Sequence, residues 1–364
     1  MHMKRLLGRI LCISAALLSA ACSGKGKTVP EETERKPLKI AYIVTRLGDR
    51  AYCDSGEKGM EQLRQEGFDV TTYEFEEDSS RYPEQMEDVI RGNHNLILAS
   101  SDFSGTVDQA ALEHPDVNFV LVDARRDPQD LLANEAALYF AQNEGSYLIG
   151  ALSAALTETN TVAIDVGMTV PVIRDFVSGY VNGVLDWNAA NGTDVRVVMA
   201  SVDSWNDPDG MKKICLDQVK NSHADIFYQV AGGSGNGLFE ACAETGTWAI
   251  GVDSDQYEAF KESDPEKAAV ILTSMVKEVG NSLIEIVHQI DEGQDIWKKT
   301  EVLGLRNKAV GYVNNELYRT HVPQRVRTAV EKAAEEVRSG RIQVKSYFDF
   351  KDEAEYLAYI QTAQ

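Results

Sequence analysis

The segment from Ala224 to Gly237, ADIFYQVAGGSGNG, combines an apolar run with a cluster of glycines. The run Ile226 to Val230 is long enough for one buried parallel strand. Glycines follow at once, and they let the backbone turn sharply and approach a ligand closely. The next residues, Leu238 to Ala243, have a helical pattern, so backbone N–H groups at the helix start would face the turn. The segment therefore predicts a strand, a glycine loop and a helix that together hold a ligand.

Two interpretations of this segment predict different classes of protein. In a dinucleotide-binding fingerprint, Asp253 would bind ribose, because it ends the next predicted strand about 20 residues further on. However, Gly233, Gly235 and Gly237 form G-x-G-x-G, and Leu238 stands where that fingerprint has its third glycine. A P-loop would need Lys-Ser or Lys-Thr after the last glycine, and a nucleophile elbow would need a glycine two residues after its serine. Neither is present, which favours a non-covalent pocket for a small polar ligand.

Metal and catalytic chemistry have little support in the sequence. Outside the leader region, which contains Cys12 and Cys22, the cysteines are Cys53, Cys215 and Cys242. An odd number without C-x-x-C spacing argues against a disulfide framework or a zinc site. The histidines are scattered without ligand spacing: His2, His94, His114, His223, His288 and His321. We therefore expect no metal, no cofactor and no catalytic residue, and hence a binding protein rather than a nucleoside hydrolase or a nicotinamide-dependent oxidoreductase.

The balance of charges excludes some partners. The chain has 36 Lys and Arg against 57 Asp and Glu, a formal net charge of −21. Removal of Lys4, Arg5 and Arg9 with a cleaved leader subtracts three positive charges and gives −24. Such an acidic chain is not expected to bind nucleic acid or an anionic lipid surface.

The first residues have the pattern of an export signal. Basic residues precede the apolar run Ile10 to Ala21, which is too short to span a membrane and predicts a signal peptide over residues 1–21. Small residues before Cys22 predict lipidation of that cysteine and a lipid anchor in the membrane. Leu18 lies four residues before the cysteine and Ser19 three, whereas a lipobox has leucine at the latter position, so an ordinary cleaved signal is the alternative. Both interpretations place the protein outside the cytoplasm, with residues 22–36 as a flexible polar tether.

From Leu38 onward, predicted strands alternate with predicted helices. In the first half the elements are strand 38–44, helix 54–66, strand 68–75, helix 82–91, strand 95–99, helix 105–113, strand 118–122 and helix 144–156. The second half has strand 161–166, helix 172–190, strand 195–201, helix 210–221, the glycine segment, strand 248–252, strand 269–272, helix 274–290 and helix 323–339. This alternation is typical of βαβ units and of parallel sheets covered by helices.

The repeated order of elements predicts an α/β fold with two similar parallel-sheet lobes and a hinged cleft between them. We expect the chain to cross between lobes near residues 157–160, 273 and 297–305. The N-terminal lobe would then comprise 37–158 plus about 274–297, and the C-terminal lobe 159–273 plus about 298–320. Residues 321–364 form an extension without an assigned role. Loops at the carboxyl ends of the strands should line the cleft.

Six segments, in order, resemble the basic membrane protein family, the purine-nucleoside-receptor-like lipoproteins that serve as binding components of ABC importers. The segments are Asp49 to Cys53 for D-x-S-F-N, Asn143 to Gly150 for E-G-S-F-L-A-G, Pro171 to Gly183 for P-x-I-x-x-F-x-x-G-Y-x-x-G, Asp225 to Gly235 for D-I-F-x-x-x-A-G-G-x-G, Gly251 to Gln256 for G-V-D-x-D-Q, and Thr273 to Lys277 for T-S-M-x-K. The resemblance covers nearly all of Leu38 to Val313. It implies a fold like that of type I periplasmic binding proteins.

The resemblance also implies roles for individual residues. The family's two base-stacking aromatic positions fall on Tyr52 and Tyr228, whose rings would enclose a purine from the two lobes. Its ribose ligands fall on Asp253 and Lys277, a carboxylate that accepts from hydroxyls and an ammonium that donates. From the residues alone, Tyr228 could instead be a core residue at a strand end, Asp253 a cap and Lys277 an exposed helix residue.

Further contacts follow from the same loops. Gly233 would let a main-chain amide reach the ligand, and Asp123, at another strand end, is a candidate for polar contact. Cys53 replaces the family's asparagine, and a thiol is a poor substitute for an amide at a purine edge. Base recognition would then rest on Asp49 or Asp54, or the ligand would be something else.

The resulting hypothesis is an exported solute-binding lipoprotein that captures a purine nucleoside and delivers it to an ABC permease by closure of its two lobes. A sugar ligand is the nearest alternative, and Cys53 is its best support. A ligand sensor of the same fold is another. Trp205, in the loop 201–210, is either a pocket wall or a surface anchor.

Overall fold

The computed structural model of this chain describes residues 36–364. The predicted signal peptide (1–21), the predicted lipidation site Cys22 and all of the predicted tether except Lys36 lie outside the described residues. Among the helices that are described, none has both the length and the apolar character needed to cross a membrane.

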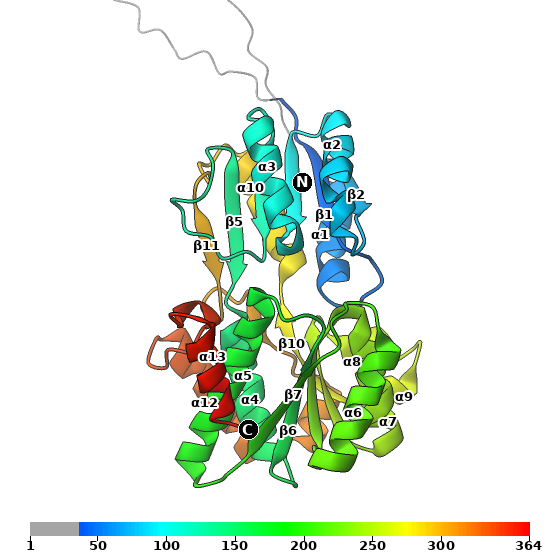
Figure 1. Ribbon diagram of the computed structural model, residues 1–364, viewed down its shortest axis with the longest axis vertical. Helices are drawn as coiled ribbons and strands as arrows, with labels where there is room; N and C mark the ends of the chain where they lie inside the picture. The colour runs from blue at the N-terminus through cyan, green and yellow to red at the C-terminus, as the bar shows by residue number, and fades with distance from the viewer. Residues whose placement is uncertain (1–35) are drawn as a thin grey trace, which may run out of the picture. The chain divides into compact units, whose positions relative to one another are not determined.

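The N-terminal lobe contains a six-stranded parallel sheet in the order β11-β5-β4-β3-β1-β2 (Figure 1). Its strands are β1 (Lys39–Val44), β2 (Asp69–Glu74), β3 (Leu96–Ser100), β4 (Asn118–Val122), β5 (Glu135–Phe140) and β11 (Thr300–Leu303). Its helices are α1 (Tyr52–Glu66), α2 (Tyr82–Arg91), α3 (Ser104–Glu113) and α10 (Val279–Asp291), with short 3-10 turns η1 (Ser79–Arg81) and η2 (Ser101–Phe103). Ile40 and Tyr42 face α1 and α10, whereas Ala41 and Ile43 face α2 and α3, because side chains alternate along a strand.

The C-terminal lobe repeats this order as β12-β10-β9-β8-β6-β7, with only β12 antiparallel to its neighbour. Its strands are β6 (Thr161–Val166), β7 (Arg196–Ser201), β8 (Ile226–Val230), β9 (Trp248–Asp253), β10 (Ile271–Lys277) and β12 (Val310–Tyr312). Its helical elements are α4 (Gln142–Leu156), α5 (Pro171–Asn191), α6 (Pro208–Ser222), η3 (Gly232–Ser234), α7 (Gly235–Thr245), α8 (Gln256–Phe260), α9 (Pro265–Ala268), α11 (Glu316–His321), α12 (Gln324–Arg338), η4 (Tyr347–Asp349) and α13 (Glu353–Gln361). The predicted α/β class with two similar lobes is confirmed.

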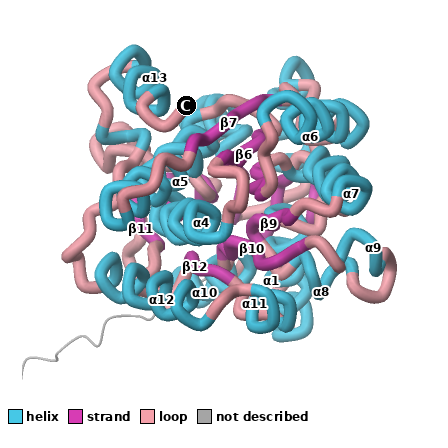
Figure 2. Tube along the Cα trace, turned by 90° about the horizontal axis from the view of Figure 1, so that it is seen from below, coloured by secondary structure: helices cyan, strands magenta, loops and turns pink. Residues whose placement is uncertain are grey.

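Helix α4 and strand β11 each lie in the lobe opposite to the one predicted for their residues. Helix α4, predicted in the N-terminal lobe, packs along α5 in the C-terminal lobe (Figure 2). Glycines allow this close packing, since a Cβ on Gly150 would lie 2.1 Å from the carbonyl oxygen of Tyr180, and a Cβ on Gly183 equally close to that of Tyr147. Strand β11 was predicted in the C-terminal lobe, yet it pairs with β5. The chain therefore crosses between the sheets after β5, after β10 and between β11 and β12.

Two local predictions also need correction. Strand β5 was not predicted, because the loop before it is long and charged and the run EAALYF has no polar alternation. Residues 274–277 were predicted as the start of a helix, but they continue β10, and the helix begins only at Val279.

The C-terminal extension is part of the C-terminal lobe. Buried apolar side chains of α12 join the main core. Ser346 Oγ and the Tyr347 amide donate to Asp175 on α5, at 2.6 and 2.8 Å. The hydroxyl of Tyr139, on β5, donates to the same carboxylate at 2.6 Å, and burial raises the pKa of Asp175 to about 6. The C-terminal extension is thus hydrogen-bonded to Asp175, which also accepts a hydrogen bond from β5, the strand after which the chain first crosses between the sheets.

Candidate functional site

A cavity of about 220 Å³ lies between the carboxyl ends of the two sheets. Its N-terminal wall comes from the loops after β1, β2, β3 and β4. Its C-terminal wall comes from the loops after β6, β7 and β8 and from the ends of β9 and β10. Parallel strands place their carboxyl ends at one edge, which is why residues far apart in the sequence meet here.

Lys277, which lines the cavity, lies between two aspartates. Its Nζ lies 2.7 Å from Asp123 Oδ2 and 3.9 Å from Asp253 Oδ1, and only 2% of its side chain is exposed. The same nitrogen lies 4.8 Å from the ring centre of Phe176 and 5.5 Å from that of Tyr52. A buried ammonium is stable here because a carboxylate and aromatic faces replace its hydration.

The two aspartates share one backbone geometry. Asp123 directly follows β4 and Asp253 ends β9, and both have φ of 63°, a left-handed conformation in which non-glycine residues are uncommon. Oδ1 of each side chain is buried without a hydrogen-bond partner in the described residues. Since buried carboxylate oxygens are normally paired, these two atoms are available to accept hydrogen bonds from a ligand.

The carboxyl group of Asp253 has a raised pKa of about 7. Burial is the main cause, Lys277 opposes the shift, and Asp123 and Asp49 add to it. The site therefore carries a carboxyl group whose charge changes near neutral pH.

Aromatic side chains from both lobes line the cavity. Tyr52 opens α1, is half-buried, and lies close enough to Val122 for its hydroxyl to donate to that carbonyl at 3.5 Å. Trp205, half-buried in the loop after β7, lines the cavity from the other lobe. Phe176 also lines it but is only 1% exposed, so it packs beneath Lys277. The partly accessible rings are thus those of Tyr52 and Trp205.

Tyr228 does not line the cavity, contrary to the expectation that its ring faces Tyr52. Its side chain is fully buried, its hydroxyl lies 3.2 Å from Ser146 Oγ, and its ring centre is 5.6 Å from that of Tyr180. The reason is the alternation along β8, which points Tyr228 at α4 and α5 and Phe227 at the opposite face. Trp205 lines the cavity from the same lobe, so of its two predicted roles, pocket wall and surface anchor, the structure agrees with the pocket wall.

Asp49 and Asp54 both accept hydrogen bonds from backbone amides at the start of α1 and in the loop before it. Asp49 lines the cavity, and its carboxylate accepts from the amides of Ala51, Cys53 and Asp54 at 2.9 to 3.1 Å. It therefore holds the first turn of α1, which is the role of an N-terminal capping residue.

Asp54 and Cys53 support the same loop. Asp54 does not line the cavity, and its carboxylate accepts from the amides of Gly48 and Arg50 at 2.7 and 2.8 Å. Cys53 lines the cavity but is 5% exposed, with Sγ 3.7 Å from Thr45 Oγ1. The hypothesis that Asp54 contacts the ligand has no support in this geometry.

The glycine loop behaves as the sequence predicts. Gly233 lines the cavity within η3, between β8 and α7. A Cβ there would lie 3.1 Å from the Trp205 carbonyl oxygen, and Gly232 has φ of 54°. The loop therefore needs glycine both for its turn and for its contact with the tryptophan loop.

Asp102 and Arg46 also line the cavity, although no motif in the sequence indicated them. Asp102 lies in η2 directly after β3, where Ser100 Oγ donates to its Oδ2 at 2.9 Å, and Trp205 is near enough to oppose the rise in the pKa of its carboxyl. Its side chain is accessible from the cavity, but surrounding protein replaces bulk water and raises the pKa of its carboxyl. Its position after a strand end, like that of Asp123, was the available signal.

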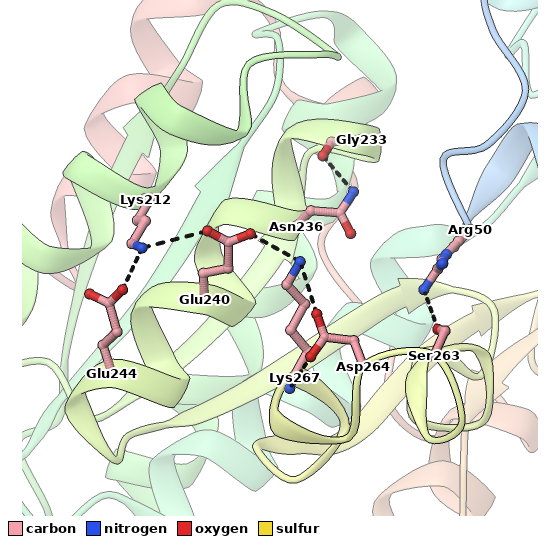
Figure 3. Close-up of polar contacts among 9 residues, drawn as sticks. All are labelled: Arg50, Lys212, Gly233, Asn236, Glu240, Glu244, Ser263, Asp264 and Lys267. Carbon is pink, nitrogen blue, oxygen red and sulfur yellow. Dashed lines mark hydrogen bonds and ion pairs between the residues drawn. The ribbon is translucent and has the colours of Figure 1, made fainter.

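The lobes also touch beside the cavity, at Arg50. Its guanidinium lies 4.2 Å from the ring centre of Phe260, and Nη1 donates to Ser263 Oγ at 3.1 Å (Figure 3). Its carbonyl accepts from Ser254 Oγ at 2.6 Å and from Gln256 at 3.3 Å. These bonds join the first loop of one lobe to α8 and its flanks in the other, so the lobes are closed against each other.

The segment that receives Arg50 is itself anchored. Glu240 on α7 pairs with Lys267 at 3.0 Å and with Lys212 at 3.5 Å, and Lys267 also pairs with Asp264 at 3.4 Å (Figure 3). Because these charged side chains are partly exposed, their ion pairs contribute little to the free energy of unfolding. They link α6, α7 and α9 to one another.

One group of possible metal ligands exists among the described residues, and it is remote from the cavity lining. Glu87, Glu113 and His114 bring ligand atoms within 4.8 Å of one another at α2 and α3. His114 Nε2 is already paired with Glu87 at 2.9 Å, and Glu113 is exposed. Such a surface cluster is an ordinary ion pair with a neighbouring acid.

Comparison with known proteins gives consistent matches along the chain. A family model described as ABC transporter substrate-binding protein, PnrA-like, matches residues 39–343. The ABC transporter nucleoside-binding protein BmpA of Lactococcus lactis is 27% identical over 363 residues, which cover 93% of this chain and 99% of that protein. Basic membrane protein A of Borreliella burgdorferi is 27% identical over 318 residues, with 86% and 88% covered.

Solved structures agree in fold. A solute-binding protein of an ABC transporter system from Aeropyrum pernix has a TM-score of 0.78 at 22% identity, covering 90% of this chain and 98% of that one. An ABC transporter periplasmic solute-binding protein from Actinobacillus succinogenes with bound D-allose has a TM-score of 0.58 at 15% identity, covering 79% and 100%.

Proposed function

Since the chain belongs to the family of PnrA-like substrate-binding proteins of ABC transporters, we propose that it binds a purine nucleoside in the cavity between its lobes. The observation that carries this proposal is the buried group of Asp123, Asp253 and Lys277, in which one oxygen of each aspartate has no hydrogen-bond partner among the described residues. A group of this kind suits a ligand end that bears several hydroxyls.

Ribose fits these residues chemically. A carboxylate accepts hydrogen bonds from vicinal hydroxyls, and the ammonium of Lys277 can donate to a hydroxyl or ring oxygen. Asp123 comes from one lobe and Asp253 and Lys277 from the other. A sugar held by both lobes favours their closed arrangement.

The base would lie between aromatic rings. Tyr52 and Trp205 are the partly accessible rings of the cavity, and they come from opposite lobes. Stacking on a flat base contributes about 1–3 kcal/mol per ring and tolerates any base. Gly233 lets a main-chain amide approach the same ligand. The relative from Lactococcus lactis, described as nucleoside-binding, supports this class of ligand.

Closure would present the loaded protein to an ABC permease. Every ligand contact shared by the two lobes shifts the equilibrium toward the closed form, and the permease would bind that form preferentially.

A lipid on Cys22 would keep the protein at the membrane surface, with residues 22–36 as a tether. Replacement of Cys22 by Ala should move the protein from the detergent phase to the aqueous phase in a phase-separation assay, whereas Cys53→Ala should not. Equal partition of both variants would contradict lipidation at Cys22.

The test of the ligand is calorimetric titration of the exported chain without its lipid. Adenosine, guanosine and inosine should bind more tightly than cytidine, uridine, free purine bases, ribose or hexoses. Asp253→Asn should weaken nucleoside binding by about 2 kcal/mol and free-base binding little. Asp295→Asn is the control, because that side chain is 78% exposed. Binding of sugars alone would reject the nucleoside, and equal losses for base and nucleoside would reject ribose recognition by Asp253.

A further inference from the structure

The cavity contains a carboxylate that no cation neutralises. Asp102 lines it from the N-terminal lobe, and within the described chain no Lys, Arg or His lies within 4.0 Å of its oxygens. Lys277 is bound instead to Asp123. Asp102 lies near enough to Tyr52 and Cys53 that its negative charge contributes to the raised pKa of both groups. A carboxylate beside the expected stacking ring can only accept hydrogen bonds, so it requires donors on the ligand.

A guanidinium lines the same cavity. Arg46 follows β1, is exposed, and forms no ion pair within the residues that the structure describes. Thr45, the residue before Arg46, has its Oγ1 3.7 Å from Cys53 Sγ, so the thiol contacts the loop that carries Arg46. Arg46 can only donate hydrogen bonds, and it therefore requires acceptors on the ligand.

These opposite requirements distinguish between purines. Guanine has acceptors at O6 and N7, to which arginine commonly donates two hydrogen bonds. It has donors at N1–H and the 2-amino group, which together match one carboxylate. Adenine has a 6-amino donor beside the N1 acceptor, and a carboxylate repels an acceptor. Hypoxanthine keeps O6, N7 and N1–H but lacks the 2-amino donor.

We propose that the cavity selects guanosine, with Asp102 accepting from N1–H and the 2-amino group and Arg46 donating to O6 and N7. This proposal rests on the proposed function, since it assumes a purine nucleoside whose ribose lies at Asp123, Asp253 and Lys277. Asp102 is then the residue that decides between purines, and the stacking rings hold any of them.

The decisive variant is Asp102→Asn, which keeps the shape and adds a donor. Calorimetric titration of the full exported chain should show guanosine binding more tightly than inosine, and inosine more tightly than adenosine. In Asp102→Asn, guanosine should bind about tenfold or more weakly. Xanthosine should bind more tightly than to the wild type, because its 2-oxo group can accept from the asparagine amide. Asp88→Asn, on a side chain 64% exposed in the same lobe, should change none of these affinities.

A second pair of variants separates recognition from closure. Trp205 of the other lobe lies near Asp102, and Trp205→Phe removes the indole N–H while keeping a ring. If Trp205→Phe reproduces the selectivity change of Asp102→Asn, or if Asp102→Asn weakens all purine nucleosides equally, the proposal is overturned. Arg46→Gln should weaken guanosine and inosine alike, and adenosine less, because adenine shares the N7 acceptor but lacks O6.

The two proposals fail differently. Absence of any nucleoside binding by the wild type would reject the proposed function. Tight binding of purine nucleosides without preference for guanosine would leave that function standing and reject base selection by Asp102.

Discussion

The two lobes have the same strand order but contribute different chemistry to the cavity. Their fourth strands, β4 and β9, lead into Asp123 and Asp253 with the same φ of 63°. Their fifth strands differ, since β5 ends at Phe140 and β10 ends at Lys277. Lys277 bonds Asp123 across the lobes at 2.7 Å and lies 3.9 Å from Asp253. Lys277, at the end of β10, thus gives Asp123 and Asp253 different electrostatic surroundings, although their backbone positions are equivalent.

The aromatic contributions differ in the same way. The N-terminal lobe offers Tyr52 from the first turn of a helix, and the C-terminal lobe offers Trp205 from a loop supported by the glycines of η3. A helix start fixes its ring more firmly than a loop does. The two rings are thus held by different kinds of element, a helix start in one lobe and a loop in the other.

The largest expected effect is that of Lys277→Met, which makes the end of β10 apolar like that of β5. It leaves two buried carboxylates without a cation, so the free energy of unfolding should fall by about 3 kcal/mol at pH 8. The loss should shrink as the pH falls and the carboxylates bind protons. Urea unfolding at pH 8 and pH 5.5 measures the loss of stability and its dependence on pH. Lys299→Met, at an exposed side chain, is the control. A small loss that is independent of pH would show that the aspartates do not depend on Lys277.

Removal of either ring should have the next largest effect. Tyr52→Ala and Trp205→Ala should each weaken nucleoside binding by about 1–3 kcal/mol, because each removes one stacking face. Tyr228→Phe should leave the affinity unchanged, since that ring lies in the core. Calorimetric titration of the three variants tests the assignment of the rings, and a loss of binding in Tyr228→Phe with normal affinity in Trp205→Ala would reverse it.

A smaller effect should come from pH, through the carboxyl group of Asp253. The ionised carboxylate is the acceptor, and its pKa is about 7, so nucleoside affinity should rise by up to about tenfold between pH 6 and pH 8. Asp253→Asn should flatten this profile. Because the pKa is raised by folding from 3.8, the native state binds more protons between pH 4 and pH 7. This group therefore lowers the free energy of unfolding as the pH rises through that range.

The smallest effect should come from Arg50→Ala at the contact between the lobes. The guanidinium contact with Phe260 is partly exposed and contributes about 0.5–1 kcal/mol. Its loss should favour the open form and weaken every ligand by about two- to fivefold, whatever its base. Selective weakening of one nucleoside would mean that Arg50 contacts the ligand rather than the other lobe.

Much of the frame could be predicted from the sequence. Alternating strand and helix patterns predicted two parallel-sheet lobes, and the glycine segment predicted the turn at η3, because both depend on residues close together in the chain. Asp123, Asp253 and Gly233 were found for the same reason, since each follows or ends a readable strand. The motifs also indicated the family that the comparison shows.

What the tertiary structure decided is which side chains meet. The family resemblance predicted Tyr228 in the pocket, but the alternation of β8 within its sheet places it in the core, which was the alternative from the residues alone. Helix α4 and strand β11 belong to the lobes opposite to those predicted, because their partners, α5 and β5, are distant in the chain. Asp102 and Arg46 reach one cavity only because parallel strands end at a common edge. Local patterns specify elements, whereas packing across the sheets and between the lobes specifies the site.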